Sequence, residues 1–386
     1  MIKSEQKVQL SKAHIQKRFV AFVICLLVAL LAFFVAIKNL TYFEVGYKTI
    51  ESEEIFDDEL IFNYYCQDRA TYKQVSVIYR DLTKQIYQLL DESNEYEGIN
   101  NVYSINHNIN QIITVDSILY DQLKTFLDSG NREILLGPVY SLYKAVFSCD
   151  QDYQTEDFSP DKNEQIKEII QQLIKFINDE NSVSIELLAD NQVRLNVSEQ
   201  YRLYMEENGL DCYIDFYWMK NSFIVDFVCD NLTERGLTQG YLCSYDGFSR
   251  FMECDDVIYH YYDILNDSIS HICDIEIEKN HCMVTYKNFI MNQFDSFYRY
   301  VYQDNSVENC YIDINDGNDY SAVSSLNIYS DTDSVVKLML ESYQYYISDS
   351  ININDDGFEF FYLKDNIFTI SDDLIKVFNL HENITK

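Results

Sequence analysis

The stretch 213–247 reads YIDFYWMKNSFIVDFVCDNLTERGLTQGYLCSYDG. Its opening apolar run, 213–216, predicts a short strand. Apolar residues then recur at spacings of three and four from Phe223 to Leu232, which predicts a helix. Gly236 stands just past this pattern, where a left-handed residue commonly ends a helix, and 240–245 predicts a second strand. Strand, helix and strand within about thirty residues are typical of an α/β unit.

The same stretch resembles the core motif of the FAD:protein FMN transferases, the ApbE-like flavin transferases. In that family a strand ends in an Asp-Leu-Gly-Gly-Ile-Ala-Lys-Gly-like loop, and the following helix carries a second Asp. Asp215 and Asp226 stand at these two Asp positions with the spacing of the family. Tyr217 and Trp218 replace the Gly-Gly pair, and Asn221 replaces the Lys. Because glycine lets backbone N–H groups approach a phosphate closely, two aromatic residues here predict a blocked phosphate loop.

Three further segments resemble the family in the same order. Gly137-Pro138 matches a family Gly-Pro. The segment 310–317, CYIDINDG, resembles His-Ile-Ile-Asp-Pro-x-Thr-Gly, with Asp313 kept and the His replaced by Cys310. The segment 331–338, DTDSVVKL, resembles Ala-Asp-Ala-Leu-Ser-Thr, with Asp333 kept and Lys337 at the Thr position. The resemblance implies an α+β fold of the flavin-transferase type over 59–386, and a bacterial source.

The resemblance also implies FAD and Mg²⁺ as cofactors, with FMN transferred from FAD to a Thr or Ser of a membrane redox protein. It places Asp215, Asp226 and Asp313 at cofactor-binding positions and Asp333 at a metal position, and it assigns no catalytic residue. Magnesium requires oxygen ligands, so Lys337 removes one. Its i, i+4 spacing from Asp333 favours an ion pair instead.

Loss of the loop glycines, the Lys, the His and the metal Thr together predicts a degenerate, inactive homologue. Transfer chemistry depends mainly on positioning and charge neutralisation, so several such losses are hard to compensate. The expected role is a binding or scaffolding module that needs no cofactor, with an envelope redox protein or a sister flavin transferase as its partner. The alternative is an active magnesium-dependent FAD:protein FMN transferase.

The N-terminal part predicts a membrane anchor. Residues 19–37, FVAFVICLLVALLAFFVAI, carry no charge, and a bilayer crossing needs ~20 apolar residues. The head, 1–18, is basic, which favours a cytoplasmic N-terminus. We therefore expect a single-pass protein of the cell membrane, with a tether over 38–58 and an extracytoplasmic body.

Charge excludes one class of partner. Residues 1–38 carry a net charge of +5. Because the whole chain has a net charge of −34, the remaining residues carry −39. Such a body repels nucleic acid.

A hairpin is predicted over 272–286, and it would bring His271 and Cys273 near His281 and Cys282. Because His281 and Cys282 would point to opposite faces of a strand, this group predicts no zinc site.

Overall fold

The computed structural model describes residues 12–41, 43–51, 59–149, 152–254, 257–277, 280–332, 334–353, 357–371 and 376–385. Its centre is a sheet of eight strands in the order β1-β2-β6-β7-β10-β13-β14-β15, in which every neighbouring pair is antiparallel. The strands are β1 (Gly46–Ile50), β2 (Leu60–Cys66), β6 (Gly240–Ser244), β7 (Phe248–Phe251), β10 (His281–Lys287), β13 (Ser325–Ser330), β14 (Glu359–Lys364) and β15 (Ile367–Ile370).

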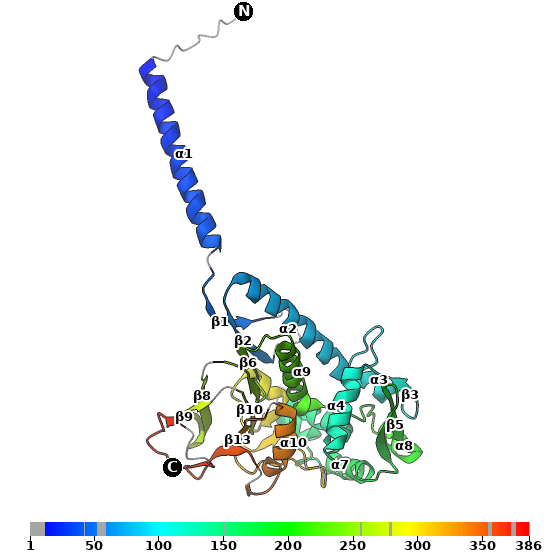
Figure 1. Cartoon of the computed structure of the whole chain (residues 1–386). Helices are drawn as coiled ribbons and strands as arrows, with labels where there is room; N and C mark the ends of the chain where they lie inside the picture. Colours follow the sequence, from blue (N-terminus) through cyan, green and yellow to red (C-terminus); the bar gives the residue numbers. More distant parts are fainter. Residues whose placement is uncertain are drawn as a thin grey trace, which may run out of the picture.

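Helices cover one face of this sheet (Figure 1). They are α2 (Arg69–Leu90), α9 (Lys220–Glu234) and α10 (Val335–Tyr346), and α9 lies between the other two and against β6 and β7. In α2 the buried residues Val75, Tyr79, Leu82, Ile86 and Leu89 recur at helical spacing and form one stripe. The predicted helix and second strand of the 213–247 stretch are confirmed. Gly236, at φ 72°, ends α9 in the left-handed conformation.

A second lobe of helices and a small sheet lies beside the α2 end of the main layer (Figure 1). Its sheet has the order β3-β5-β4. Its elements are α3 (Val102–His107), β3 (Ile112–Thr114), α4 (Ser117–Asp128), α5 (Gly137–Phe147), α6 (Asp152–Phe158), α7 (Glu164–Ile177), β4 (Val183–Leu188), β5 (Gln192–Val197) and α8 (Glu199–Glu207). Short strands β11 (Arg299–Val301) and β12 (Val307–Asn309) pair with each other.

The predicted hairpin over 272–286 is wrong. β9 (Ser268–Ile277) pairs with β8 (Val257–Leu265) and β16 (Val377–Phe378), whereas β10 joins the main sheet between β7 and β13. The three-stranded sheet packs on the sheet face opposite the helices, where Tyr259 and Tyr261 contact Phe361 of β14. Both strands exist as predicted, but alternation alone does not say which strand each one pairs with.

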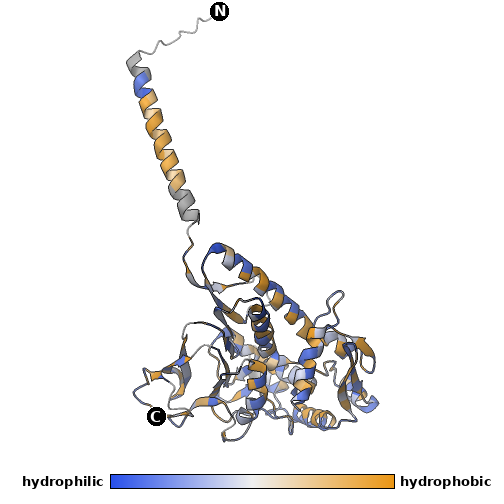
Figure 2. Ribbon diagram, in the orientation of Figure 1, coloured by the Kyte–Doolittle hydropathy of each residue, from blue (hydrophilic) through white to orange (hydrophobic). Residues whose placement is uncertain are grey.

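The N-terminal helix α1 (Lys12–Thr41) stands away from the body (Figure 1). Figure 2 shows its apolar middle as a continuous orange band. Within it, Gln16–Phe34 is long and apolar enough to cross a membrane, with no part of the span buried against the body. Such a helix fits a membrane anchor or a signal sequence. β1 lies inside the segment expected to be a tether, so the folded body begins before residue 59.

Candidate functional site

The segment before α9 is not a strand, contrary to the expectation for 213–216. Its backbone groups are satisfied by a side chain instead. Asn106 of α3 accepts hydrogen bonds from the amides of Tyr213 (3.0 Å) and Ile214 (2.9 Å) and donates to the carbonyl of Ile214 (3.0 Å). The amide of Asp215 donates to the carbonyl of Ile134 at 2.8 Å. Buried backbone groups need partners, and here one amide side chain replaces a neighbouring strand.

The packing around Gly137 shows why the Gly-Pro pair has a glycine. A Cβ at this position would lie 2.9 Å from the carbonyl oxygen of Cys212 and from the carbonyl carbon of Tyr213. Only glycine permits so close an approach. Pro138 follows in the first turn of α5, where its missing N–H costs nothing. The pair therefore fixes α5 against the 212–215 segment and sets the position of Lys144, two turns further along.

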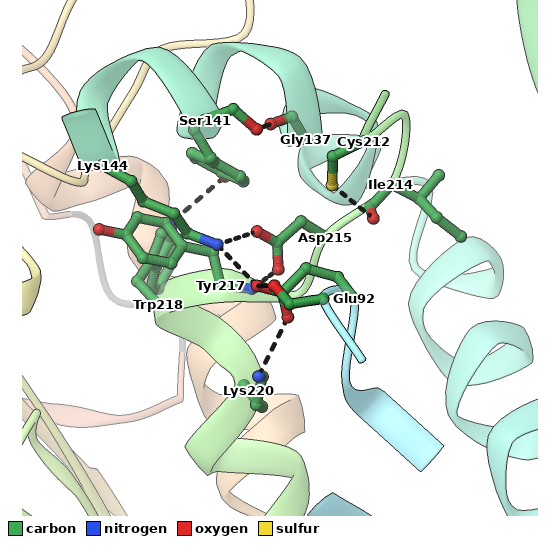
Figure 3. Close-up of polar contacts among 12 residues, drawn as sticks. Glu92, Gly137, Ser141, Lys144, Cys212, Ile214, Asp215, Tyr217, Trp218 and Lys220 are labelled. Atoms are coloured by element: carbon green, nitrogen blue, oxygen red, sulfur yellow. Dashed lines mark hydrogen bonds and ion pairs between the residues drawn. The ribbon is translucent and has the colours of Figure 1, made fainter. Parts of the chain in front are cut away.

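Four charged residues meet at this point (Figure 3). Lys144 Nζ lies 2.6 Å from Oδ2 of the fully buried Asp215 and 2.9 Å from Oε1 of Glu92, and Lys220 Nζ lies 3.2 Å from Oε2 of Glu92. Burial raises the pKa of Asp215, and both lysines oppose that rise. Burial also favours a higher pKa for Glu92, but the charges of Lys220 and Lys144 hold that pKa below the usual range. The charges compensate one another within the protein.

Tyr217 and Trp218 occupy the positions at which the resembled loop has glycines. Tyr217 adopts φ +35°, a conformation that favours glycine. Its hydroxyl donates to the carbonyl of Phe297 at 2.6 Å, and Trp218 Nε1 donates to the Tyr140 hydroxyl at 3.3 Å. Both side chains are buried. Tyr217 thus has a backbone conformation typical of glycine, while the side chains of both residues pack inside the protein.

Three N–H groups of this loop also have partners. The amide of Tyr217 donates to Asp215 Oδ1 (2.7 Å), that of Met219 to the Phe216 carbonyl (2.8 Å), and that of Lys220 to the Tyr217 carbonyl. A phosphate cradle needs free N–H groups and close backbone approach. Three paired amides and two buried aromatic side chains therefore do not fit the pyrophosphate of FAD.

A cavity of about 370 Å³ remains beside the loop. It is lined by Glu59, Leu60, Tyr87, Glu92, Lys144, Tyr217, Lys220, Asn221, Phe294, Phe297 and Tyr298. Asn221, at the Lys position of the resembled loop, donates to Glu59 Oε2 (2.9 Å) and to Asp246 Oδ2 (3.0 Å). Burial, with Glu59 next to it, raises the pKa of Asp246. A neutral amide thus joins two carboxylates where a cation is expected.

The carboxylate of Asp226 makes structural contacts. Its carboxylate accepts from the amides of Val335 and Val336 (both 2.9 Å) and from Ser334 Oγ (2.7 Å), and it lies 3.2 Å from Arg250. It therefore binds the N-terminus of α10 and joins that helix to α9. Its place as a cofactor-binding residue stays a prediction.

The remaining predicted residues lie in a separate turn, next to the loop or outside the described structure. Cys310 is next to the loop, since the ring of the following residue, Tyr311, lies 5.3 Å from that of Trp218. Asp313 accepts from the amide and side chain of Asn315 in its own turn (2.8 and 2.7 Å). Cys310 is buried. Asp333, the predicted metal ligand and ion-pair partner, lies outside the described residues. Lys337 Nζ lies 4.0 Å from Glu341, the next acidic residue along α10.

Sequence reasoning missed Glu92 and Lys144. Neither falls in a family-like motif, and they come from the ends of different helices, α2 and α5. The one usable signal was Lys220, a cation one residue away from the family position. It lines the cavity with its ammonium turned to Glu92.

Comparisons with known proteins agree with this architecture. No sequence-family profile matches the chain, and no curated protein matches it. Among solved structures, the ApbE protein of Thermotoga maritima is similar with a TM-score of 0.58 and 13% identity, covering 86% of this chain and 96% of that one. A variant of the flavin transferase ApbE from Vibrio cholerae has a TM-score of 0.51 and 12% identity, covering 85% and 97%.

The apo form of the flavinyl transferase ApbE from Pseudomonas stutzeri has a TM-score of 0.50 and 9% identity, covering 88% and 96%. Three structures from three organisms thus match nearly their whole length. The low identities agree with the replaced motif residues. The chain has the α+β fold of the ApbE flavin transferases.

Proposed function

We propose that this protein is a membrane-anchored, degenerate member of the flavin-transferase fold that serves as a binding or scaffolding module and transfers no FMN. The fold supports a function related to flavin transferases. The observation that carries the proposal is the loop at Tyr217 and Trp218. Its side chains fill the space of the phosphate cradle, and three of its amides bond within the protein.

The charge of the cavity supports the same conclusion. A dianionic pyrophosphate needs uncompensated cations or a metal. Lys144 and Lys220 are both paired with carboxylates, and Glu59 adds another carboxylate to the lining. An anion entering here would have to displace Glu92 from two ion pairs. The cavity suits a neutral or cationic group of a partner better than a phosphate.

The location is part of the proposal. The apolar span of α1 and the basic residues before it favour a retained anchor with a cytoplasmic N-terminus. The body then lies outside the cytoplasm, where it could meet an envelope redox protein or a sister flavin transferase.

The test is a fluorescence titration of FAD with the full-length chain in mild detergent, with and without Mg²⁺. Beside it, the chain is incubated with FAD, Mg²⁺ and a Thr-containing acceptor domain of a membrane redox protein, and a gel is read for covalent flavin. The Vibrio cholerae flavin transferase, assayed with the same acceptor, shows that the acceptor is competent.

We expect weak FAD binding without dependence on Mg²⁺ and no flavin on the acceptor band. Flavin fluorescence on that band would overturn the proposal and establish the alternative, an active magnesium-dependent transferase. Tightening of ten-fold or more on adding Mg²⁺, about 1.4 kcal/mol, would show that a metal–FAD site survives.

A further inference from the structure

We propose that His260, His271 and Asp274 form a binding site for one Zn²⁺ ion on the three-stranded sheet. The site is separate from the cavity beside α9, because it lies on β8 and β9 and not on the main sheet. The ligand atoms of the three residues all lie within 4.8 Å of one another. The proposal is independent of whether the flavin-transferase fold is active.

A β-bulge brings the three side chains to one face. His260 lies directly opposite Asp274 across the two strands. His271 precedes Asp274 by three residues, a spacing that places side chains on opposite faces of a regular strand. The register shifts there, so that Tyr261 pairs with Cys273 and Tyr262 with His271, which leaves Ile272 as an extra residue. The extra residue reverses the alternation and turns His271 to the face of His260 and Asp274.

The C-terminal segment holds this bulge in place. The carbonyl of Ile272, the residue with no opposite partner in β8, accepts from the amide of His381 at 2.8 Å. The side chain of Asn379 donates to Asp274 Oδ2 at 2.6 Å. Asp274 Oδ1 is thereby left facing the two imidazoles. Metal-binding carboxylates are commonly oriented by a second hydrogen bond of this kind.

The distances fit a small cation with modest movement. Asp274 Oδ1 lies 2.6 Å from His260 Nδ1 and 2.7 Å from His271 Nε2. Around a tetrahedral Zn²⁺ with bonds near ~2.0–2.2 Å, ligand atoms stand roughly 3.4 Å apart. The two histidines must therefore retreat by less than about 1 Å. Both are side chains at the surface, 62% and 34% exposed, so they are free to do so.

The donor set selects the metal. Two imidazole nitrogens and one carboxylate oxygen suit Zn²⁺, whereas Mg²⁺ prefers an oxygen-only shell. Three protein ligands leave a fourth position open to water or to a group from a partner. Asp274 is 13% exposed and carries the negative charge, which lowers the cost of placing a dication between two neutral rings.

The experiment uses the full-length chain in detergent, freed of metal with a chelator and titrated with ZnCl₂ by calorimetry. We expect one Zn²⁺ per chain, with affinity at least ten-fold lower in His260→Gln, His271→Gln and Asp274→Asn. His107→Gln, on α3, is the matched control and should bind as the wild type does. Excess MgCl₂ should not compete.

Substitution with Co²⁺ gives a readout that needs no variant. Bands in the visible region without a thiolate charge-transfer band in the near ultraviolet support the nitrogen and oxygen site. A thiolate band would place the metal on cysteines and overturn the proposal. So would an absence of Zn²⁺ binding, or binding that folded His260→Gln, His271→Gln and Asp274→Asn variants all retain.

Discussion

Lys144 Nζ lies 2.6 Å from Oδ2 of Asp215, a carboxylate with no exposed surface. The pair joins α5 to the segment before α9, and Glu92 and Lys220 extend it to α2 and α9. The site thus gathers three segments that are far apart in sequence, around Glu92, around Lys144 and from Asp215 to Lys220. Both lysines of this network are thus paired with carboxylates in the wall of the cavity.

Replacing Lys144 by Met should therefore destabilise the protein. The change leaves Asp215 without its nearest cation. Removing one partner of a buried ion pair lowers the free energy of unfolding by about 3 kcal/mol or more. The free energy of unfolding, measured with urea, gives the loss. Lys124→Met removes an exposed pair with Asp128 and is the control, with little expected effect. Equal losses in the two variants would contradict a structural role for the Lys144 pair.

Tyr217 allows a test of backbone strain. At φ +35° an L-residue other than glycine is strained by roughly 1–2 kcal/mol. Both Tyr217→Gly and Tyr217→Ala lose the same ring contacts, so their difference reports the backbone alone. We expect the Gly variant to be more stable than the Ala variant by about 1 kcal/mol.

Tyr140, whose ring lies 5.1 Å from that of Tyr217, supplies the matched pair. It lies in the helix α5, where Gly is less stable than Ala by roughly 0.5–1 kcal/mol. The order of the two variants should therefore invert between the positions. The same order at both would mean that Tyr217 has an ordinary conformation.

The titration of Asp319 should make the free energy of unfolding depend on pH. Burial, with Asp161 and Glu308 nearby, raises the pKa of Asp319 to about 7. The unfolded chain releases this proton near pH ~3.9, so between these values the folded state binds more protons than the unfolded state. Stability from this group is complete below pH ~4 and falls as pH rises toward 7, by up to about 1.4 kcal/mol per pH unit.

Asp319→Asn should flatten that slope in urea unfolding measured from pH 4 to pH 8, and it should be more stable than the wild type at pH 8. Asp190→Asn, at the exposed turn between β4 and β5, should leave the slope unchanged. An identical slope in Asp319→Asn and the wild type would show that Asp319 is already ionised throughout.

Proteolysis can test the membrane topology that α1 predicts. External protease added to intact cells should remove the chain beyond about residue 45, allowing for a bilayer ~30 Å thick. A cytoplasmic protein in the same sample should stay intact. Retention of residues 12–41 on the membrane, read by mass spectrometry, separates an anchor from a cleaved signal sequence. Complete protection of the body would refute the extracytoplasmic location.

Local pattern predicted much of the fold and less of the site. The periodicity of α9, the left-handed Gly236 and the strand β6 followed from residues near in sequence. The 213–216 strand failed because Asn106 supplies the hydrogen bonds that a neighbouring strand would give, and no pattern in 213–216 reveals a partner over a hundred residues away. The pairing of β9 failed for a different reason. β9 pairs with β8, which directly precedes it, and alternation alone does not say which neighbouring strand is the partner.

The site followed the same rule. The replacements at Tyr217 and Trp218 predicted a filled loop, and their side chains are buried there. The partners of the lysines could not be predicted, because Glu92 and Lys144 belong to no motif. The metal-like group on β8 and β9 depends on a bulge, and a bulge reverses the face that alternation assigns to His271.

Restoring the family residue at position 337 should not restore a metal site. Lys337 is exposed and lies near Glu341, so Lys337→Thr should cost only about 0.3 kcal/mol in urea unfolding. FAD binding by the full-length variant should stay weak and independent of Mg²⁺, because Tyr217 and Trp218 still fill the loop. Glu341→Gln removes the same pair without restoring a Thr and is the matched control. Mg²⁺-dependent FAD binding in Lys337→Thr, but not in Glu341→Gln, would mean that the loop admits the cofactor and that Lys337 alone had excluded the metal.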